Sequence, residues 1–303
     1  MPSTSRSARL HPRHTARRRL SALGSLAAAV ALVTGLAAPA SAAEPTAPAE
    51  QPEQAALAEQ GAQRPVLHPD LDFAGSTVAA HEGRAGTPGA LALSVTQTPG
   101  LDVASYQGNV NWASVKANGA RFAYVKATEG TTYTNPYFTQ QYNGSYNAGL
   151  IRGAYHFALP DRSSGTAQAN WFVDHGGGWS RDGRTLPPAL DIEYNPYGAT
   201  CFGLGQSAMV SWIRSFSNTV HTRTGRYPTI YTTTNWWSTC TGNNGGFGTT
   251  NPLWIARYAS SVGTLPNGWS YQTIWQYADS GTFPGDQNVF NGAYDRIQAL
   301  ANG

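Results

Sequence analysis

Two carboxylic acids lie two residues apart in the run LPPALDIEYNP (residues 186–196), which is otherwise mainly apolar. Side chains at positions i and i+2 of a β-strand share one face, so Asp191 and Glu193 would point the same way, about 6 to 7 Å apart along the backbone. Burying two carboxylates together is costly, and each raises the pKa of the other. Such a pair can hold the proton that a general acid must deliver, which gives it a chemical use.

Other polar and aromatic side chains stand at the ends of further predicted strands. They are Asp102, Lys126 with Glu129, Tyr155 with His156, Tyr231, Arg257 with Tyr258, and Trp275 with Gln276 and Tyr277, while Asp286 is expected in the last loop. Several carboxylates facing an aromatic cleft, without an obvious nucleophilic Ser or Cys motif, indicate glycosidic bond cleavage. The acids could instead pair with Arg or bind a metal, Tyr and Trp are more often core residues, and His156 alone is more often a hydrogen-bonded core histidine.

Alternating strands and helices would bring these residues together. Seven apolar runs are typical of strands: GLDVASY, FAYVKATEG, LIRGAYHFA, PALDIEY, YPTIYTT, PLWIARY and TIWQYA. Helix-like stretches separate the first five runs, and each ends at a glycine expected to cap it, namely Gly119, Gly149, Gly176 and Gly225. Repeated strand–helix–strand units predict parallel strands joined by crossovers. We therefore expect an α/β fold, a single TIM-barrel-like (β/α) barrel with some shortened or missing helices, whose chemistry gathers at the carboxyl ends of its strands.

Two segments precede this barrel domain, which is expected over residues 98–303. Residues 1–42 carry six Arg and no acid in their first 20 positions, then an apolar stretch that ends in Ala40-Ser41-Ala42. This pattern predicts a secretory signal peptide; a membrane anchor is disfavoured because the apolar core is short and a cleavage site follows. Residues 43–97 are rich in Ala, Pro, Glu, Gln and Gly and lack sustained apolar periodicity, so a flexible or removable pro-segment is expected.

Charge and composition restrict the partners. The whole chain has a formal net charge of +3, but the six arginines of residues 1–20 account for more than this, so the protein without its signal is near −3. The domain has only two lysines, Lys116 and Lys126, and no basic stripe that could bind nucleic acid. We expect a secreted, extracellular monomer with no nucleic acid partner and no membrane contact after signal removal.

Cys201 and Cys240 are the only cysteines. In an exported chain two cysteines usually join, so we expect a structural disulfide. Closing a loop of this length should stabilise the fold by roughly 4 kcal/mol in the loop-entropy model. A metal site would need more ligands nearby, so no metal is expected.

The sequence of the barrel domain resembles that of a known enzyme family. Residues 101–302 resemble the family 25 glycoside hydrolases, bacterial muramidases often called lysozymes. Eight pieces follow in the family's order: GLDVASYQGNVNW, FAYVKATEGTTYTN, AGLIRGAYHFALP, LPPALDIEYNP, TIYTTTNWW, PLWIARY, IWQYADSG and GDQNVFNG.

The resemblance implies a role for each matching residue. Glu193 would be the general acid/base, and Asp191, Asp102 and Asp286 would complete the acidic floor of the cleft. Sugar-facing aromatic residues would be Tyr155, Tyr231, Trp254 and Trp275. The chain departs from the family where His-Trp commonly follows the first strand, since it has Ser105-Tyr106, and at Tyr194, where His is often found. These departures bear on fine specificity, and they leave the four acids in place.

The resulting expectation is a secreted muramidase that cleaves the β-1,4 bond between N-acetylmuramic acid and N-acetylglucosamine in peptidoglycan, with retention and without a cofactor. A chitin or other N-acetylhexosamine hydrolase is disfavoured, because the acidic strand of one large chitinase family is absent: apolar residues 186–190 precede Asp191. A sugar-binding protein on an inactive barrel would have no need for both Asp191 and Glu193.

Overall fold

The computed structural model describes residues 67–85 and 96–303, where eight strands close into a barrel. These strands are β1 (Thr98–Val103), β2 (Phe122–Glu129), β4 (Ile151–Phe157), β5 (Ala189–Asp191), β6 (Thr229–Thr232), β7 (Leu253–Ala256), β8 (Ile274–Ala278) and β9 (Asp286–Phe290). The sheet order is β1-β9-β8-β7-β6-β5-β4-β2, and pairing of β1 with β2 closes it. The short strand β3 (Tyr133–Thr134) pairs antiparallel with the end of β2. The predicted α/β barrel is thereby confirmed.

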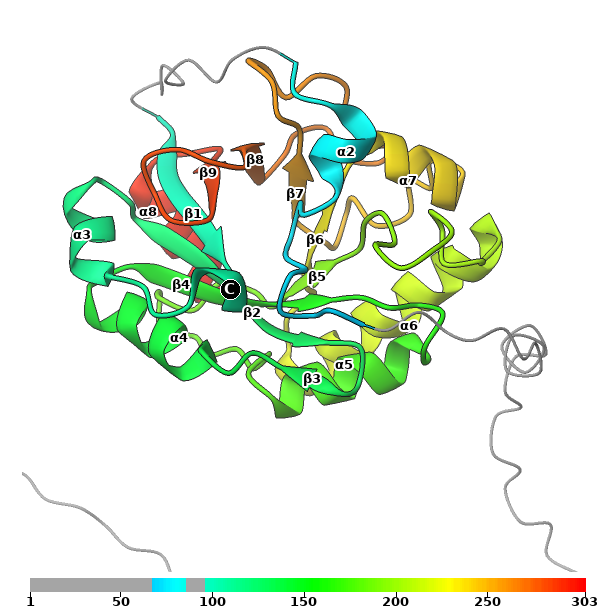
Figure 1. Cartoon of the computed structure of the whole chain (residues 1–303), viewed down its shortest axis with the longest axis horizontal. Coiled ribbons are helices and arrows are strands. Elements are labelled where there is room, and N and C mark those ends of the chain that lie inside the picture. The colour runs from blue at the N-terminus through cyan, green and yellow to red at the C-terminus, as the bar shows by residue number, and fades with distance from the viewer. Residues whose placement is uncertain (1–66, 86–95) are drawn as a thin grey trace, which may run out of the picture. The chain divides into compact units, whose positions relative to one another are not determined.

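Helices lie around these strands (Figure 1). They are α3 (Trp112–Ala117), α4 (Phe138–Asn147), α5 (Gly165–Asp174), α6 (Gln206–Thr224), α7 (Thr234–Thr241) and α8 (Tyr294–Asn302), with a 3-10 turn η1 (Ser105–Gln107). The four predicted capping glycines all have positive φ, between 76° at Gly225 and 117° at Gly176. No helix within residues 67–85 or 96–303 is long and apolar enough to cross a membrane.

The barrel contains both parallel and antiparallel strand pairs, whereas the sequence predicted parallel strands only. β9 runs antiparallel to both β8 and β1. Asp286, expected in the last loop, is instead the first residue of β9. The alternation of strands and helices ends after β7, because residues 257–285 contain no helix either between the parallel strands β7 and β8 or between β8 and β9. The antiparallel connection from β8 to β9 needs only a short loop.

Strand alternation divides the core into two layers. On β4, Tyr155 points into the barrel and packs edge-on against Trp254 of β7, with ring centroids 6.2 Å apart. Its neighbour His156 points outward and stacks on Phe216 of α6. The inner layer thus carries the side chains that reach the mouth of the barrel, while the outer layer fixes the helices.

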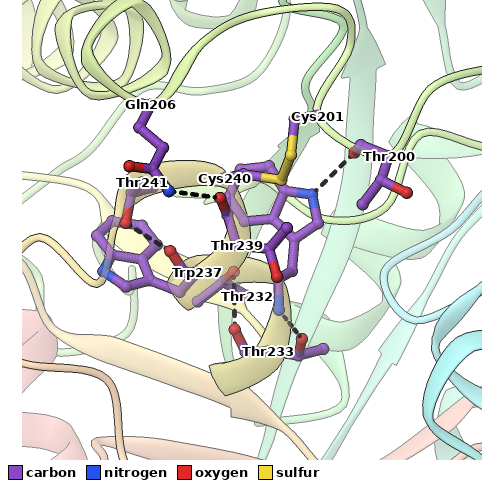
Figure 2. The surroundings of a disulfide bond; sticks show 10 residues. Thr200, Cys201, Gln206, Thr232, Thr233, Trp237, Thr239, Cys240 and Thr241 are labelled. Carbon is purple, nitrogen blue, oxygen red and sulfur yellow. Dashed lines mark hydrogen bonds between the residues drawn. A yellow bond between two sulfur atoms is a disulfide. The ribbon is translucent and has the colours of Figure 1, made fainter.

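A disulfide links the loop after β5 to α7, as predicted (Figure 2). Cys201 and Cys240 have Cα atoms 5.3 Å apart, within the usual range for this bond. Nearby, the side-chain amide of Gln206 donates to the carbonyl of Thr239 at 3.1 Å. The crosslink therefore joins two elements that follow the carboxyl ends of β5 and β6.

Residues 67–85 correct part of the prediction for residues 43–97. They contain a short helix, α2 (Val78–Glu82), and bury Ala74 and Val78 completely against the inner core. These residues are therefore packed rather than flexible, because the barrel supplies the apolar surface that the segment itself lacks. Residues 43–66 and 86–95, and the predicted signal peptide, lie outside the described residues.

Candidate active site

Two of the four predicted acids face each other across neighbouring strands. Asp102 of β1 and Asp286 of β9 are paired in register. The side-chain amide of Gln276 donates to both, at 3.0 Å to Asp102 and 2.9 Å to Asp286, and Asn288 donates to Asp102 at 2.6 Å. Burial raises the pKa of Asp102 to about 7, and burial together with the Asp102 charge holds the pKa of Asp286 well above its usual range.

Of the other two acids, Asp191 is the last residue of β5, and Glu193 lies two residues beyond the strand that was expected to hold both. Asp191 is 1% exposed, and neither carboxylate oxygen has a hydrogen-bond partner among the described residues. Burial, followed by the nearby charge of Glu193, raises the pKa of Asp191 well above its usual range. Burial also raises the pKa of Glu193 to about 8. Both shifts favour retention of a proton by the pair, which is the property that a general acid needs.

A buried ion pair stands beside these acids at the end of β2. The ammonium group of Lys126 lies 2.6 Å from Oε2 of Glu129, and both side chains are almost completely buried. Tyr197 donates a hydrogen bond to the other carboxylate oxygen of Glu129 at 2.9 Å. Because each charge has a partner, this pair is a fixed part of the wall of the site.

Two predicted sugar-facing residues lie inside the barrel near the acids. The hydroxyl of Tyr231 donates to Oε1 of Gln276 at 2.7 Å, which links it to the amide that binds Asp102 and Asp286. The hydroxyl of Tyr155 accepts a hydrogen bond from the backbone N–H of Ala74 at 3.2 Å. Both hydroxyls are thus directed toward the mouth of the barrel.

The two predicted tryptophans are placed differently. Trp254 is fully buried in the inner layer, stacks on Tyr124 and donates to Asn288 at 2.7 Å, so it supports the acidic floor from below. Trp275 was predicted to face the sugar, but its side chain points away from the acids. Its neighbour Gln276 faces the acids, and since adjacent strand residues point to opposite faces, Trp275 packs in the outer layer.

His156 is a core residue, in agreement with the simpler interpretation of the sequence. One ring nitrogen bonds Thr128 at 2.8 Å and the other bonds Gln168 at 2.9 Å. Burial lowers its pKa to about 3, so the ring is neutral at physiological pH.

Sequence reasoning gave no role to three residues that organise the acids. Gln276 and Asn288 donate to the carboxylates, and the hydroxyl of Tyr258 lies 3.1 Å from Oε1 of Gln276. The signal was the two-residue period of the strands: Asn288 follows Asp286 by two positions on β9 and must share its face. Within the described ranges, no cluster of three or more His, Cys, Asp or Glu side chains could hold a metal ion.

Comparison with known proteins agrees with this arrangement. Residues 101–286 match the family model described as "Glycosyl hydrolases family 25". The chain is 52% identical over 208 residues to an N,O-diacetylmuramidase from Chalaropsis sp., covering 67% of this chain and 99% of that protein. Its identity to Lysozyme M1 from Streptomyces globisporus is 51% over 208 residues, covering 67% of this chain and 71% of that protein.

Solved structures give the same result. A muramidase from Acremonium alcalophilum aligns with a TM-score of 0.67 and 60% identity, covering 68% of this chain and 99% of that one. A family GH25 lysozyme from Aspergillus fumigatus aligns with a TM-score of 0.68 and 51% identity, covering 69% and 100%. The chain belongs to family 25 of the glycosyl hydrolases. It is a glycoside hydrolase of the lysozyme class, so the predicted family and enzyme class are confirmed.

Proposed function

We propose that this chain is a secreted muramidase that hydrolyses the β-1,4 bond between N-acetylmuramic acid and N-acetylglucosamine in bacterial peptidoglycan. The observation that carries the proposal is the meeting of four acids, each at most 2% exposed, at one end of a family 25 barrel. Relatives named muramidase and lysozyme support the substrate class. The paired cysteines and the signal-like first 42 residues support export.

In this mechanism Glu193 is the general acid/base. It protonates the oxygen of the leaving sugar as the glycosidic bond breaks, and it later takes a proton from the attacking water. Asp191 lies two residues away and neither of its oxygens has a hydrogen-bond partner among the described residues, so its carboxylate, once ionised, can stabilise the positive sugar ring that develops. The amides of Gln276 and Asn288 hold Asp102 and Asp286 in place below the sugar.

Retention of configuration follows from two displacements at the same carbon. The first displacement would be made either by an Asp carboxylate or by the acetamido group of the substrate itself. The second would be made by water, activated by Glu193, on the face that the leaving sugar has vacated, opposite to the first nucleophile. Neither route calls for a metal or an organic cofactor.

The role of Glu193 can be tested by substitution in the domain of residues 96–303. Glu193→Gln keeps the shape of the side chain but removes its acid, so kcat on purified peptidoglycan should fall by about 10² to 10⁴. Asp174→Asn is the matched control, because Asp174 pairs with Arg223 on the exposed face of α5. Release of reducing ends measures both variants. If Glu193→Gln cleaved peptidoglycan at the wild-type rate, the carboxylate would have only a structural role and the proposed mechanism would be contradicted.

A further inference from the structure

The acids of the proposed site are covered by the chain itself. Residues 67–85 precede the barrel in sequence and bury Asp72, Ala74, Gly75 and Val78 against it. Figure 1 draws this segment in blue and cyan, with α2 near β7. The family model begins only at residue 101, so the family match does not account for this segment.

The segment contacts the proposed general acid directly. The backbone N–H of Gly75 donates to Oε1 of Glu193 at 2.6 Å, and the hydroxyl of Thr77 donates to Oε2 at 3.2 Å. Both oxygens that would meet the leaving sugar are therefore engaged. The remaining exposed fraction of the Glu193 side chain is 2%.

Gly75 is fitted to this position. Its φ is +95°, a conformation that glycine adopts easily, and a Cβ atom there would collide with Tyr258 Oη and approach Gln276 Oε1 and Tyr231 Oη closely. The Gly75 carbonyl accepts from Tyr258 at 3.2 Å. The backbone of this one residue thus fills the space between the acids and the inner tyrosines.

Polar groups that a glycan would need are also occupied. The N–H of Ala74 donates to Tyr155, and the carbonyl of Ala74 accepts from Gln276 at 2.9 Å. Lys126 donates to the carbonyls of Pro69 at 3.0 Å and Asp72 at 2.7 Å. The segment therefore satisfies buried donors and acceptors that would otherwise bond a sugar or water.

Contacts on both sides fix the ends of the segment. On the N-terminal side, the Tyr197 hydroxyl contacts the carboxylate of Asp72 as well as that of Glu129, so its single proton is shared between them. On the C-terminal side, His81 stacks on Tyr194 with ring centroids 4.0 Å apart, and Tyr194 donates to Glu82 at 2.7 Å. Arg84 forms an ion pair with Asp279.

We propose that residues 67–85 are an intramolecular inhibitor that occupies the glycan cleft, so that the chain is an inactive precursor until the segment is removed. This inference rests on the proposed function, since it takes Glu193 and Asp191 as the catalytic pair. A polymer cannot reach carboxylates that are at most 2% exposed. Cutting the chain between Ala85 and β1 would release the segment while leaving the barrel strands intact.

The test compares a chain starting at residue 43 with a domain of residues 96–303. The domain should fold alone, because solved relatives align over 99% and 100% of their own length with about this part of the chain. We expect the domain to release reducing ends from peptidoglycan about tenfold faster or more, since the longer chain can act only from its open fraction. If both proteins cleave at the same rate, the proposed function stands and the inhibition is refuted.

Matched glycine substitutions locate the block within the longer chain. Gly75→Val should activate it, because the new side chain collides with the inner tyrosines. Gly83→Val is the control: Gly83 also has positive φ, +71°, but nothing lies within 4 Å of its Cβ position. Equal activation by both variants would contradict the role assigned to Gly75.

Binding of the segment in trans tests the inhibition without catalysis. A labelled peptide of residues 67–85 should bind the domain, and soluble disaccharide-repeat fragments of peptidoglycan should displace it. If neither protein cleaves peptidoglycan, the proposed function fails, and this binding experiment still decides whether the segment and the glycan share one site. A peptide that does not bind, or that the fragments do not displace, overturns the inference.

Discussion

At the scale of single residues, environment sets the chemistry of the acids. Asp102 is held by two amides, Asp191 by none, and Glu193 by groups from residues 67–85. Their types and their positions at or just beyond strand ends could be predicted from the sequence, although β5 ends at Asp191 and Glu193 lies two residues beyond it. Their protonation could not, because it depends on burial and on partners from distant parts of the chain.

Raised pKa values predict how stability depends on pH. An acid whose pKa is higher in the folded state loses its stabilising contribution as pH rises through that pKa. Asp102 and Glu193, with pKa values raised to about 7 and about 8, therefore act in this sense, as do Asp191 and Asp286. His156 acts in the opposite sense, but only below its unfolded pKa of about 6.5.

The melting temperature of the chain starting at residue 43 should therefore fall by several degrees between pH 6.5 and pH 8.5. Asp102 and Glu193 together should lose roughly 2 to 3 kcal/mol over this range. Thermal melts at fixed ionic strength measure the effect. The Asp102→Asn, Glu193→Gln double variant is the comparison and should show a smaller fall. Stability that rises across this range would contradict the assigned pKa directions.

At the scale of elements, sequence pattern predicted the regular part of the barrel well. Helix α6 has buried residues Met209, Ile213, Phe216 and Val220 on one face, and Gly225 caps it with φ +76°. The pattern failed where tertiary contacts replace local signals. β9 has polar Asp286, Gln287 and Asn288 in its first three positions and no helix before it, so its strand character comes from pairing with β1 and β8.

The disulfide between Cys201 and Cys240 gives a prediction at this scale. Reduction should lower the melting temperature of the domain by several degrees. The crosslink lowers the entropy of the unfolded chain, which adds roughly 4 kcal/mol at most to the free energy of unfolding in the loop-entropy model. Melts with and without reductant test this, and the Cys201→Ser, Cys240→Ser variant should match the reduced protein. Free thiols in the native protein would contradict the pairing.

At the scale of the whole molecule, the chain combines a barrel of the lysozyme family with a segment that covers its acids. Composition predicted residues 43–97 to be flexible because no sustained apolar pattern runs through them. That prediction considered only the apolar surface that a segment can bury against its own residues. Ala74 and Val78 are instead buried against residues of the barrel. Residues 67–85 are ordered because they fit the surface of the barrel. The shape of that surface cannot be read from the sequence of the segment.

The most direct measurement identifies the sugar at each new reducing end after the domain of residues 96–303 acts on purified peptidoglycan. The products are reduced with borohydride, hydrolysed and analysed by mass spectrometry, with the Glu193→Gln domain as the control for background. We expect muraminitol, from N-acetylmuramic acid at the new ends, and none above background in the control. Glucosaminitol in its place, or no new ends from a folded domain, would contradict the proposed muramidase.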